Sequence, residues 1–168
     1  MLQTDILKYL RLVNDELNRL DCKGEICLYG GAAMSLVFNA RPSTKDVDAV
    51  FEPSNIIKQI VKKLADEQGL DDDWLNDGVK GFIVEHPRQI FLELPNLTVY
   101  AADPDYLLAM KCLASRIDTI DNSDIRFLIG QLQLITPEQV FAVIQKYYPK
   151  NRIRPATQFF IEELFSTT

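Results

Sequence analysis

The chain has 168 residues, of which 47% are hydrophobic and 25% charged, a balance that suits a globular protein with its own core. Its 24 acidic and 18 basic residues give a net charge of −6, which argues against a protein that coats nucleic acid through many cationic side chains. No apolar stretch approaches the ~20 residues that cross a bilayer, and the charged first segment is unlike a signal peptide. We therefore expect a cytoplasmic protein with no membrane partner.

The first part of the chain alternates predicted helices with short predicted strands. Apolar side chains that recur near a 3.6-residue period predict the helices, and short apolar or alternating segments predict the strands. The expected helices cover residues 4–20, 32–38 and 55–68. The expected strands cover residues 25–29, 46–51, 81–84, 89–94 and 97–100. A small mixed sheet with flanking helices follows from this order.

From Asp103 onward the pattern becomes helical. Pro104 follows Asp103, and proline is favoured at the first position of a helix. Thr136 and Gln139 have the spacing of a capping box. The sequence predicts an α+β fold, with an α/β core at residues 1–102 and an all-helical region at residues 103–168 packed on it. The four helices expected in that region cover residues 104–118, 121–133, 137–148 and 156–165.

Two aspartates stand two positions apart in a predicted strand. Asp46 and Asp48 are expected to point to the same face, since alternate side chains of a strand do so. Two carboxylates about 5 Å apart repel by roughly 3 kcal/mol at an effective dielectric constant of about 20. A metal relieves that repulsion, and carboxylate oxygens suit Mg²⁺ or Mn²⁺ shared with nucleotide phosphates. A wet strand end with two solvated acids is the alternative for this pair alone.

A pair of glycines, Gly30 and Gly31, lies between the first predicted strand and the helix after it. Glycine lets backbone N–H groups approach phosphate closely, although a simple tight turn is the better reading of a lone pair. The order strand, glycine pair, helix and then a strand with Asp46 and Asp48 supplies phosphate donors and metal ligands from one continuous unit. This order predicts a site for a nucleoside triphosphate.

Tyr29-Gly30-Gly31 followed by Asp46-Val47-Asp48-Ala49 resembles the signature of the nucleotidyltransferase superfamily of DNA polymerase beta and the aminoglycoside nucleotidyltransferases. Arg41 and Thr44 precede the aspartates, as in bacterial members related to the AbiEii toxins. The resemblance implies that Gly30, Gly31, Arg41 and Thr44 bind the nucleotide. It also implies that Asp46 and Asp48 bind the metal and are catalytic.

The resemblance to AbiEii and mycobacterial MenT toxins extends to two residues of the helical region. In that group a later helix carries a lysine that is followed by an aspartate, and here the match is Lys111 and Asp124. The resemblance implies nucleotide binding and catalysis for Lys111 and catalysis for Asp124. A surface lysine with a packed stem is the alternative for Lys111.

Asp124 falls on the apolar face of its predicted helix, where an unpaired carboxylate is costly. Pairing with Lys111 or Arg116 would relieve that cost. Alternatively, Asp121 is the N-cap of the helix and Asp124 occupies its third position, where the helix dipole favours an acid. The sequence leaves both readings open.

As a whole, the resemblance implies Mg²⁺-dependent transfer of a nucleoside monophosphate from a triphosphate to RNA, including a tRNA end, or to a protein. A toxin with a cognate antitoxin is the implied setting. A nucleotide-binding module of weak activity, or a γ-phosphate transferase, are the alternatives.

Four further features of the sequence bear on this chemistry. Glu93, in a later predicted strand, is the candidate for a third metal-binding carboxylate, although a surface acid is the plainer reading. The basic segment at residues 146–154 is a candidate acceptor surface, or simply a solvated face. His86, the one histidine, has no Cys or Asp motif near it in the sequence, so we expect no catalytic role for it. Three cysteines without zinc-ligand spacing are expected to be buried, reduced thiols: Cys22, Cys27 and Cys112.

Overall fold

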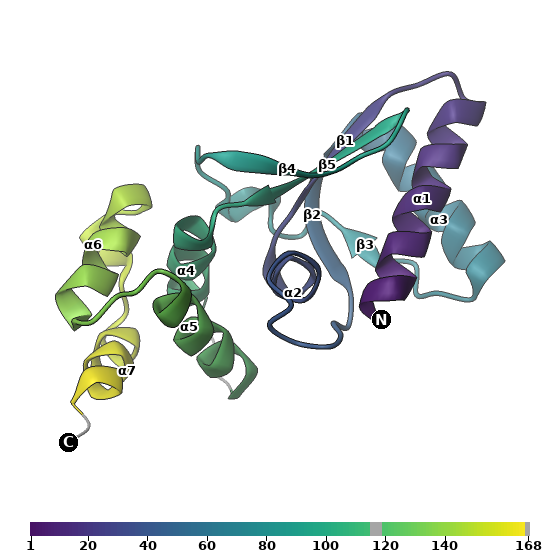
Figure 1. Cartoon of the computed structure of the whole chain (residues 1–168). Coiled ribbons are helices and arrows are strands. Elements are labelled where there is room, and N and C mark those ends of the chain that lie inside the picture. The colour runs from purple at the N-terminus through teal and green to yellow at the C-terminus, as the bar shows by residue number, and fades with distance from the viewer. Residues whose placement is uncertain (115–118, 167–168) are drawn as a thin grey trace. The chain divides into compact units, whose positions relative to one another are not determined.

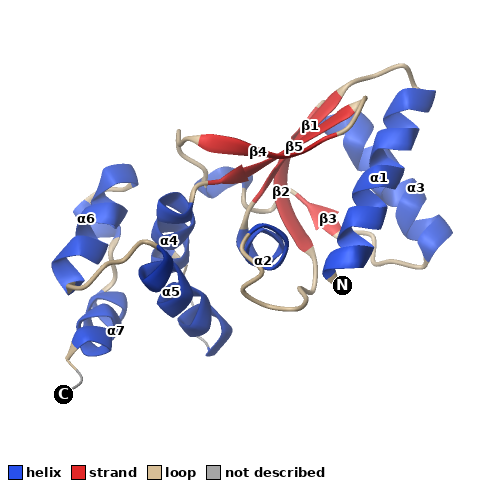
Figure 2. Ribbon diagram, in the orientation of Figure 1, coloured by secondary structure: helices blue, strands red, loops and turns tan. Residues whose placement is uncertain are grey.

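The computed structural model describes residues 1–114 and 119–166, with the backbone alone at residues 119–121. The fold is α+β, as predicted, and its residues group into two compact units (Figure 1, Figure 2). The first unit comprises Met1–Ile83 and Pro87–Ala102, and the second comprises Val84–His86 and Asp103–Thr168. Across the described residues, no helix is long and apolar enough to cross a membrane.

The first unit contains a five-stranded mixed sheet in the order β3-β2-β1-β5-β4. β1 runs antiparallel to β2 and parallel to β5, while β3 runs parallel to β2 and β4 runs antiparallel to β5. The strands are β1 (Gly24–Leu28), β2 (Val47–Glu52), β3 (Leu75–Asn76), β4 (Arg88–Glu93) and β5 (Leu97–Ala102). The helices of this unit are α1 (Gln3–Arg19), α2 (Gly30–Ala32), a π-helix (Ala33–Val37), α3 (Ser54–Gln68) and a 3₁₀ turn (Lys80–Phe82).

One local prediction in this unit was wrong, and two others are confirmed as elements but differ in their bounds or helix type. The strand expected at residues 81–84 is instead a 3₁₀ turn, and Phe82 within it is 62% exposed, so no apolar face is buried there. The helix expected at residues 32–38 begins at Gly30 and continues as a π-helix. The second strand begins at Val47, so Asp46 lies in the bend before it.

The core of the first unit forms between the sheet and the helices α1 and α3. Figure 1 shows these two helices side by side on one side of the sheet and α2 on the other. A Cβ atom on Gly24 of β1 would lie 2.9 Å from Leu17 of α1 and 3.3 Å from Ile57 of α3, so both helices pack closely against the strand at this glycine. The register pairs Leu28 with Ala49, so the alternate residue Asp48 points to the face that carries α2.

The second unit is helical, with α4 packed against both α5 and α6, and α7 packed against α6. Val84–His86 joins this unit because the Val84 N–H donates to the Tyr106 hydroxyl and the His86 ring stacks on the Tyr106 ring. Its helices are α4 (Pro104–Leu113), α5 (Thr119–Gln131), α6 (Pro137–Tyr147), a 3₁₀ turn (Lys150–Arg152) and α7 (Pro155–Phe165).

The predicted helix starts in this unit are confirmed at Pro104 and Pro137, and the capping box is half formed. The Thr136 hydroxyl accepts a hydrogen bond from the Gln139 N–H, but the Gln139 side chain accepts from the N–H of Ile135 rather than from Thr136. α4 ends at Leu113, earlier than the predicted residue 118.

All three cysteines are free thiols, as expected. Cys27 and Cys112 are buried, and burial raises the pKa of the Cys27 thiol and raises that of Cys112 to about 12. Cys22 is only half-buried, so the expectation of three buried cysteines was wrong at that position.

Candidate functional site

Gly30 brings the end of β1 against a carboxylate of the neighbouring strand. The Tyr29 N–H donates to the Asp48 carbonyl oxygen over 2.9 Å, which aligns the two segments. Gly30 has a φ of +54°, and a Cβ atom placed there would lie 2.9 Å from Oδ2 of Asp48. Both the left-handed backbone and the close carboxylate therefore require glycine at this position.

Gly31 lies against two polar side chains of the loop before β2. A Cβ atom on Gly31 would lie 2.6 Å from Nη2 of Arg41 and still closer to Oγ1 of Thr44. A glycine here thus lets a guanidinium and a hydroxyl approach the backbone directly. We call Gly30, Gly31, Arg41, Thr44 and Asp48 the glycine cradle. All five are among the residues that the sequence singled out, and the fold brings them together.

The Thr44 side chain also links the cradle to Asp46. Its hydroxyl donates to the Asp46 carbonyl oxygen over 3.1 Å. Burial alternates along this stretch, with Val47 and Ala49 buried and Asp46 and Asp48 partly exposed. Asp46 precedes the strand, but this alternation continues through it and agrees with the prediction that the two aspartates point to the same face.

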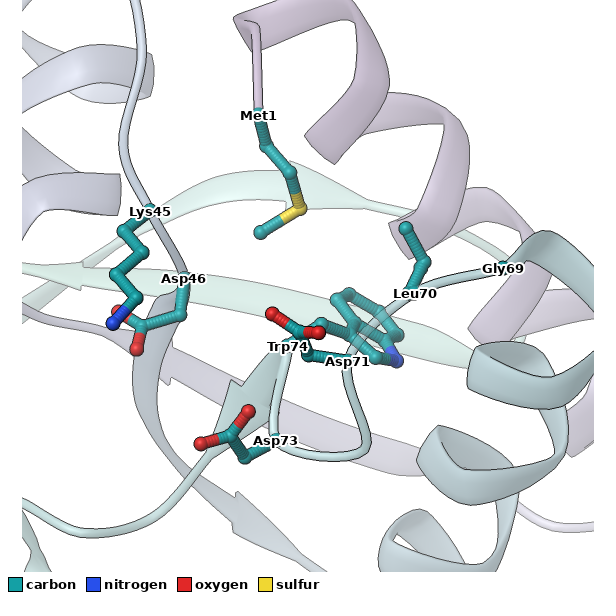
Figure 3. Close-up of a pocket in the computed structure, with 8 residues that line it drawn as sticks. All are labelled: Met1, Lys45, Asp46, Gly69, Leu70, Asp71, Asp73 and Trp74. Carbon is teal, nitrogen blue, oxygen red and sulfur yellow. The ribbon is translucent and has the colours of Figure 1, made fainter.

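Asp46 lines a pocket with a volume of about 190 Å³. Figure 3 shows Lys45 and Asp46 on one side of it and Asp71 and Trp74, from the loop after α3, on the other. Trp74 is fixed, because its Nε1 donates to the carbonyl oxygen of Val61 in α3. The remaining lining residues are Met1, Gly69, Leu70 and Asp73.

Asp71 and Asp73 line this pocket although the sequence did not single them out. Both are exposed in the loop between α3 and β3, and the loop is held beside Asp46 because the Val47 N–H donates to the Trp74 carbonyl oxygen. β3 is only two residues long, too short for its pairing with β2 to be visible as a pattern. The acidic run itself was the one available signal.

A divalent cation at this site would depend on carboxylates together with phosphate. Among residues 1–114 and 119–166, no group of three or more His, Cys, Asp or Glu side chains is arranged to hold a metal ion. Mg²⁺ commonly takes one or two carboxylates and completes its shell with water and substrate phosphates. Asp48 beside the glycine backbone, with Asp46 two residues away, fits that partial donor set.

Glu93 does not complete the site. It pairs with Thr98 near the end of the sheet where Gly24 pairs with Leu97, whereas the glycine pair follows the opposite end of β1. Glu93 is exposed, and the β4–β5 register carries it away from Asp48, so the reading of Glu93 as a surface acid agrees with the structure.

Lys111 and Asp124 form an ion pair within the second unit. Nζ of Lys111 lies 2.8 Å from Oδ2 of Asp124, and the two side chains are 13% and 5% exposed. α5 begins at Thr119, so Asp121 lies inside the helix and the N-cap reading was wrong. The alternative partner Arg116 lies outside the described residues. The roles of Lys111 and Asp124 in nucleotide binding and catalysis stay predictions.

The basic segment at residues 146–154 is partly neutralised. Nζ of Lys146 donates to Asp105 over 2.8 Å, and the Arg152 guanidinium lies over the Tyr148 ring. Burial alone would raise the pKa of Asp105, but hydrogen bonds from Lys146 and Tyr147 outweigh it and hold that pKa below its usual value. Two of the cationic side chains in this segment, Lys146 and Arg152, are thus already in contact with other residues of the chain.

Comparison of the chain with known protein families, curated proteins and solved structures finds no match. The contacts of the glycine cradle and the order of its residues along the chain are therefore the grounds for a functional conclusion.

We expect Gly31→Ala to disrupt the cradle. The added methyl group would overlap Arg41 and Thr44, so the free energy of unfolding should fall by about 1–3 kcal/mol. Gly81→Ala is the matched control, since a Cβ atom there meets nothing within 4 Å. Urea unfolding of both variants measures the difference, and equal stabilities would contradict the close approach at Gly31.

We expect Lys111→Met to destabilise the protein strongly, because it removes a cation that lies 2.8 Å from the buried Asp124 carboxylate. The loss should be about 3 kcal/mol or more, and the double variant Lys111→Met with Asp124→Leu should regain most of it. Lys146→Met is the control, because its ion pair with Asp105 is more exposed and should contribute about 1 kcal/mol or less. Thermal unfolding of the four proteins checks this order.

Proposed function

We propose that the chain is a Mg²⁺-dependent nucleotidyltransferase, which transfers a nucleoside monophosphate from a triphosphate to an acceptor hydroxyl. The observation that carries the proposal is the glycine cradle. The backbone at Gly31 meets a guanidinium and a hydroxyl, and the backbone at Gly30 meets the carboxylate of Asp48. Cationic and neutral donors for phosphate thus stand next to an acidic ligand for a metal.

The cradle suits a polyphosphate for stereochemical reasons. Gly30 has no side chain and is half-buried, so a phosphate oxygen can approach its backbone closely, whereas Gly31 is buried against Arg41 and Thr44. The planar guanidinium of Arg41 can donate two hydrogen bonds to one phosphate group, and the Thr44 hydroxyl adds a neutral donor. The carboxylates of Asp46 and Asp48 would repel phosphate unless a cation lay between them.

Asp48 and Asp46 are the residues that would hold Mg²⁺. When bound, the ion would neutralise charge on the triphosphate and on the leaving pyrophosphate. The protein's own residues hold and orient the substrate. Gly30, Gly31, Arg41 and Thr44 fix the phosphates so that the α-phosphorus faces the acceptor, and such positioning lowers the entropic part of the barrier.

The proposed reaction forms a bond between the acceptor oxygen and the α-phosphorus. The bond from the α-phosphorus to the oxygen that bridges to the β-phosphate breaks, and pyrophosphate leaves with that electron pair. The hydroxyl proton passes to water. Arg41 stabilises the negative charge that develops on the phosphates during this exchange.

The acceptor is proposed from the resemblance to AbiEii-type toxins. On that ground the acceptor is RNA, with a tRNA end or a protein side chain as alternatives, and the protein acts as a toxin with a cognate antitoxin. The rival functions use the same triphosphate site: a γ-phosphate transferase, or a nucleotide-binding module of weak activity.

Triphosphates labelled at the α or the γ position test the proposal. The protein is incubated with each of the four ribonucleoside triphosphates, Mg²⁺, total RNA and cell lysate. We expect label from the α position on an acceptor and none from the γ position. Asp48→Asn should lower transfer by about 100-fold or more, since it removes a charge from the reacting centre. Asp72→Asn, an exposed aspartate of the neighbouring loop, is the control and should keep full activity.

The other outcomes are equally informative. Label from the γ position would instead support a phosphotransferase. Triphosphate binding without any transfer would favour the binding module. Absence of both binding and transfer with all four nucleotides would rule out every function that relies on this site.

A further inference from the structure

The segment Met1–Gln3 is bonded to both ends of the loop that carries Arg41 and Thr44. We call residues 39–44 the cradle loop. At its start, Nε2 of Gln3 donates to the Ser35 carbonyl oxygen over 2.9 Å and to Oδ1 of Asn39 over 2.7 Å. One side-chain amide thus ties the π-helix that follows the glycine pair to the first residue of the cradle loop.

The end of the cradle loop is held by the main chain of the same segment. The Thr44 N–H donates to the Met1 carbonyl oxygen over 3.0 Å, and the Met1 nitrogen donates to the Thr44 carbonyl oxygen over 2.6 Å. Leu2 and Ser43 form an antiparallel bridge between these bonds. Thr44 is therefore fixed from the segment side by its main chain and from the other side by its hydroxyl bond to Asp46.

The start of the cradle loop is bonded to the π-helix through its main chain and to Gln3 through a side chain. The Ala40 N–H donates to the Met34 carbonyl oxygen over 2.8 Å. The π-helix closes with a long hydrogen bond of 3.4 Å from the Phe38 N–H to the Ala33 carbonyl oxygen. Asn39 then adopts a left-handed φ of +52°, a conformation that asparagine takes more readily than most residues with a Cβ atom. Oδ1 of Asn39 accepts a hydrogen bond from the Gln3 amide.

Gln3 can do this because the rest of α1 is anchored independently. It is the first residue of the helix, and its own side chain is half-buried. Ile6 and Leu10, on the buried face of the next two turns, are fully enclosed in the core. Loss of the Gln3 amide should therefore free the cradle loop without unfolding the helix.

We infer that Gln3 is a positioning residue of the proposed nucleotide site: its amide holds the cradle loop so that Arg41 and Thr44 lie against Gly31. This inference rests on the proposed function, because it assigns Gln3 an effect on triphosphate binding through Arg41. If the Gln3 hydrogen bonds only stabilised the first turn of α1, a change at Gln3 would not alter triphosphate binding through Arg41.

A double-mutant cycle separates the two roles. Binding of each ribonucleoside triphosphate with Mg²⁺ is measured by titration calorimetry. Gln3→Ala should raise the Kd about fivefold, which corresponds to the loss of one or two ordinary hydrogen bonds. In an Arg41→Ala background the same change should have less than about a twofold effect, since the residue it positions is gone. Equal effects in both backgrounds would overturn the inference.

Two further variants make the cycle specific. Gln3→Glu keeps the shape of the side chain but cannot donate to the two oxygens, so it should weaken binding at least as much as Gln3→Ala. Gln89→Glu makes the same chemical change at an exposed position of β4 and should leave the Kd unchanged. A loss of binding in Gln89→Glu equal to that in Gln3→Glu would assign the effect to charge and overturn the inference.

Amide hydrogen exchange of the nucleotide-free protein tests the same inference without a ligand. Gln3→Ala should speed exchange at Ala40 and Thr44 and leave the amides of α3 unchanged. Unchanged protection of the cradle loop would overturn the inference while leaving the proposed function intact. Faster loop exchange in a protein that binds no triphosphate would overturn the proposed function, and with it the link from Gln3 to nucleotide binding.

Discussion

The close approach of the Gly31 backbone to Arg41 and Thr44 is the contact on which the proposed site depends. It requires a residue without a side chain in α2, three residues after β1 ends, and it requires the loop before β2 to return to that point. The π-helix after the glycine pair supplies part of this path, and such helical irregularities are frequent at functional sites. A side chain at position 31 would push Arg41 and Thr44 away from the main chain. The pairing of β1 with β2 does not depend on that position.

The sheet places the acidic half of the site by its register. The antiparallel pairing of β1 with β2 sets Asp48 opposite Tyr29, immediately before the glycine pair. The same alternation buries Val47 and Ala49 against the helices, so the strand that builds the core also orients the carboxylate. Stability and site geometry thus come from one strand, which explains why the site needs few residues of its own. Lys111 and Asp124, by contrast, pair with each other inside the second, helical unit.

The sequence predicted the glycine pair, Arg41, Thr44 and Asp48, because their types and order along one strand–helix–strand unit carry the signal. It did not predict β3 or the role of Gln3, since both depend on contacts between segments far apart in the chain. The sequence predicted Asp46 as part of the strand because the alternation of polar and apolar residues begins at Asp46. The hydrogen-bonded strand β2 begins one residue later, at Val47. The sequence could not decide whether Glu93 reaches the site, because a residue type and a predicted strand do not fix which end of a sheet a residue occupies.

An amide NMR titration with a nucleoside triphosphate and Mg²⁺ tests the central claim most directly. If the glycine cradle holds the phosphates, the largest chemical-shift changes fall on the amides of Gly30, Gly31 and Thr44. Gly81, which has open space around it, should be unaffected. Changes confined to the second unit, for example around the pocket lined by Phe141 and Ile153, would contradict the claim. So would a spectrum that does not change at saturating nucleotide.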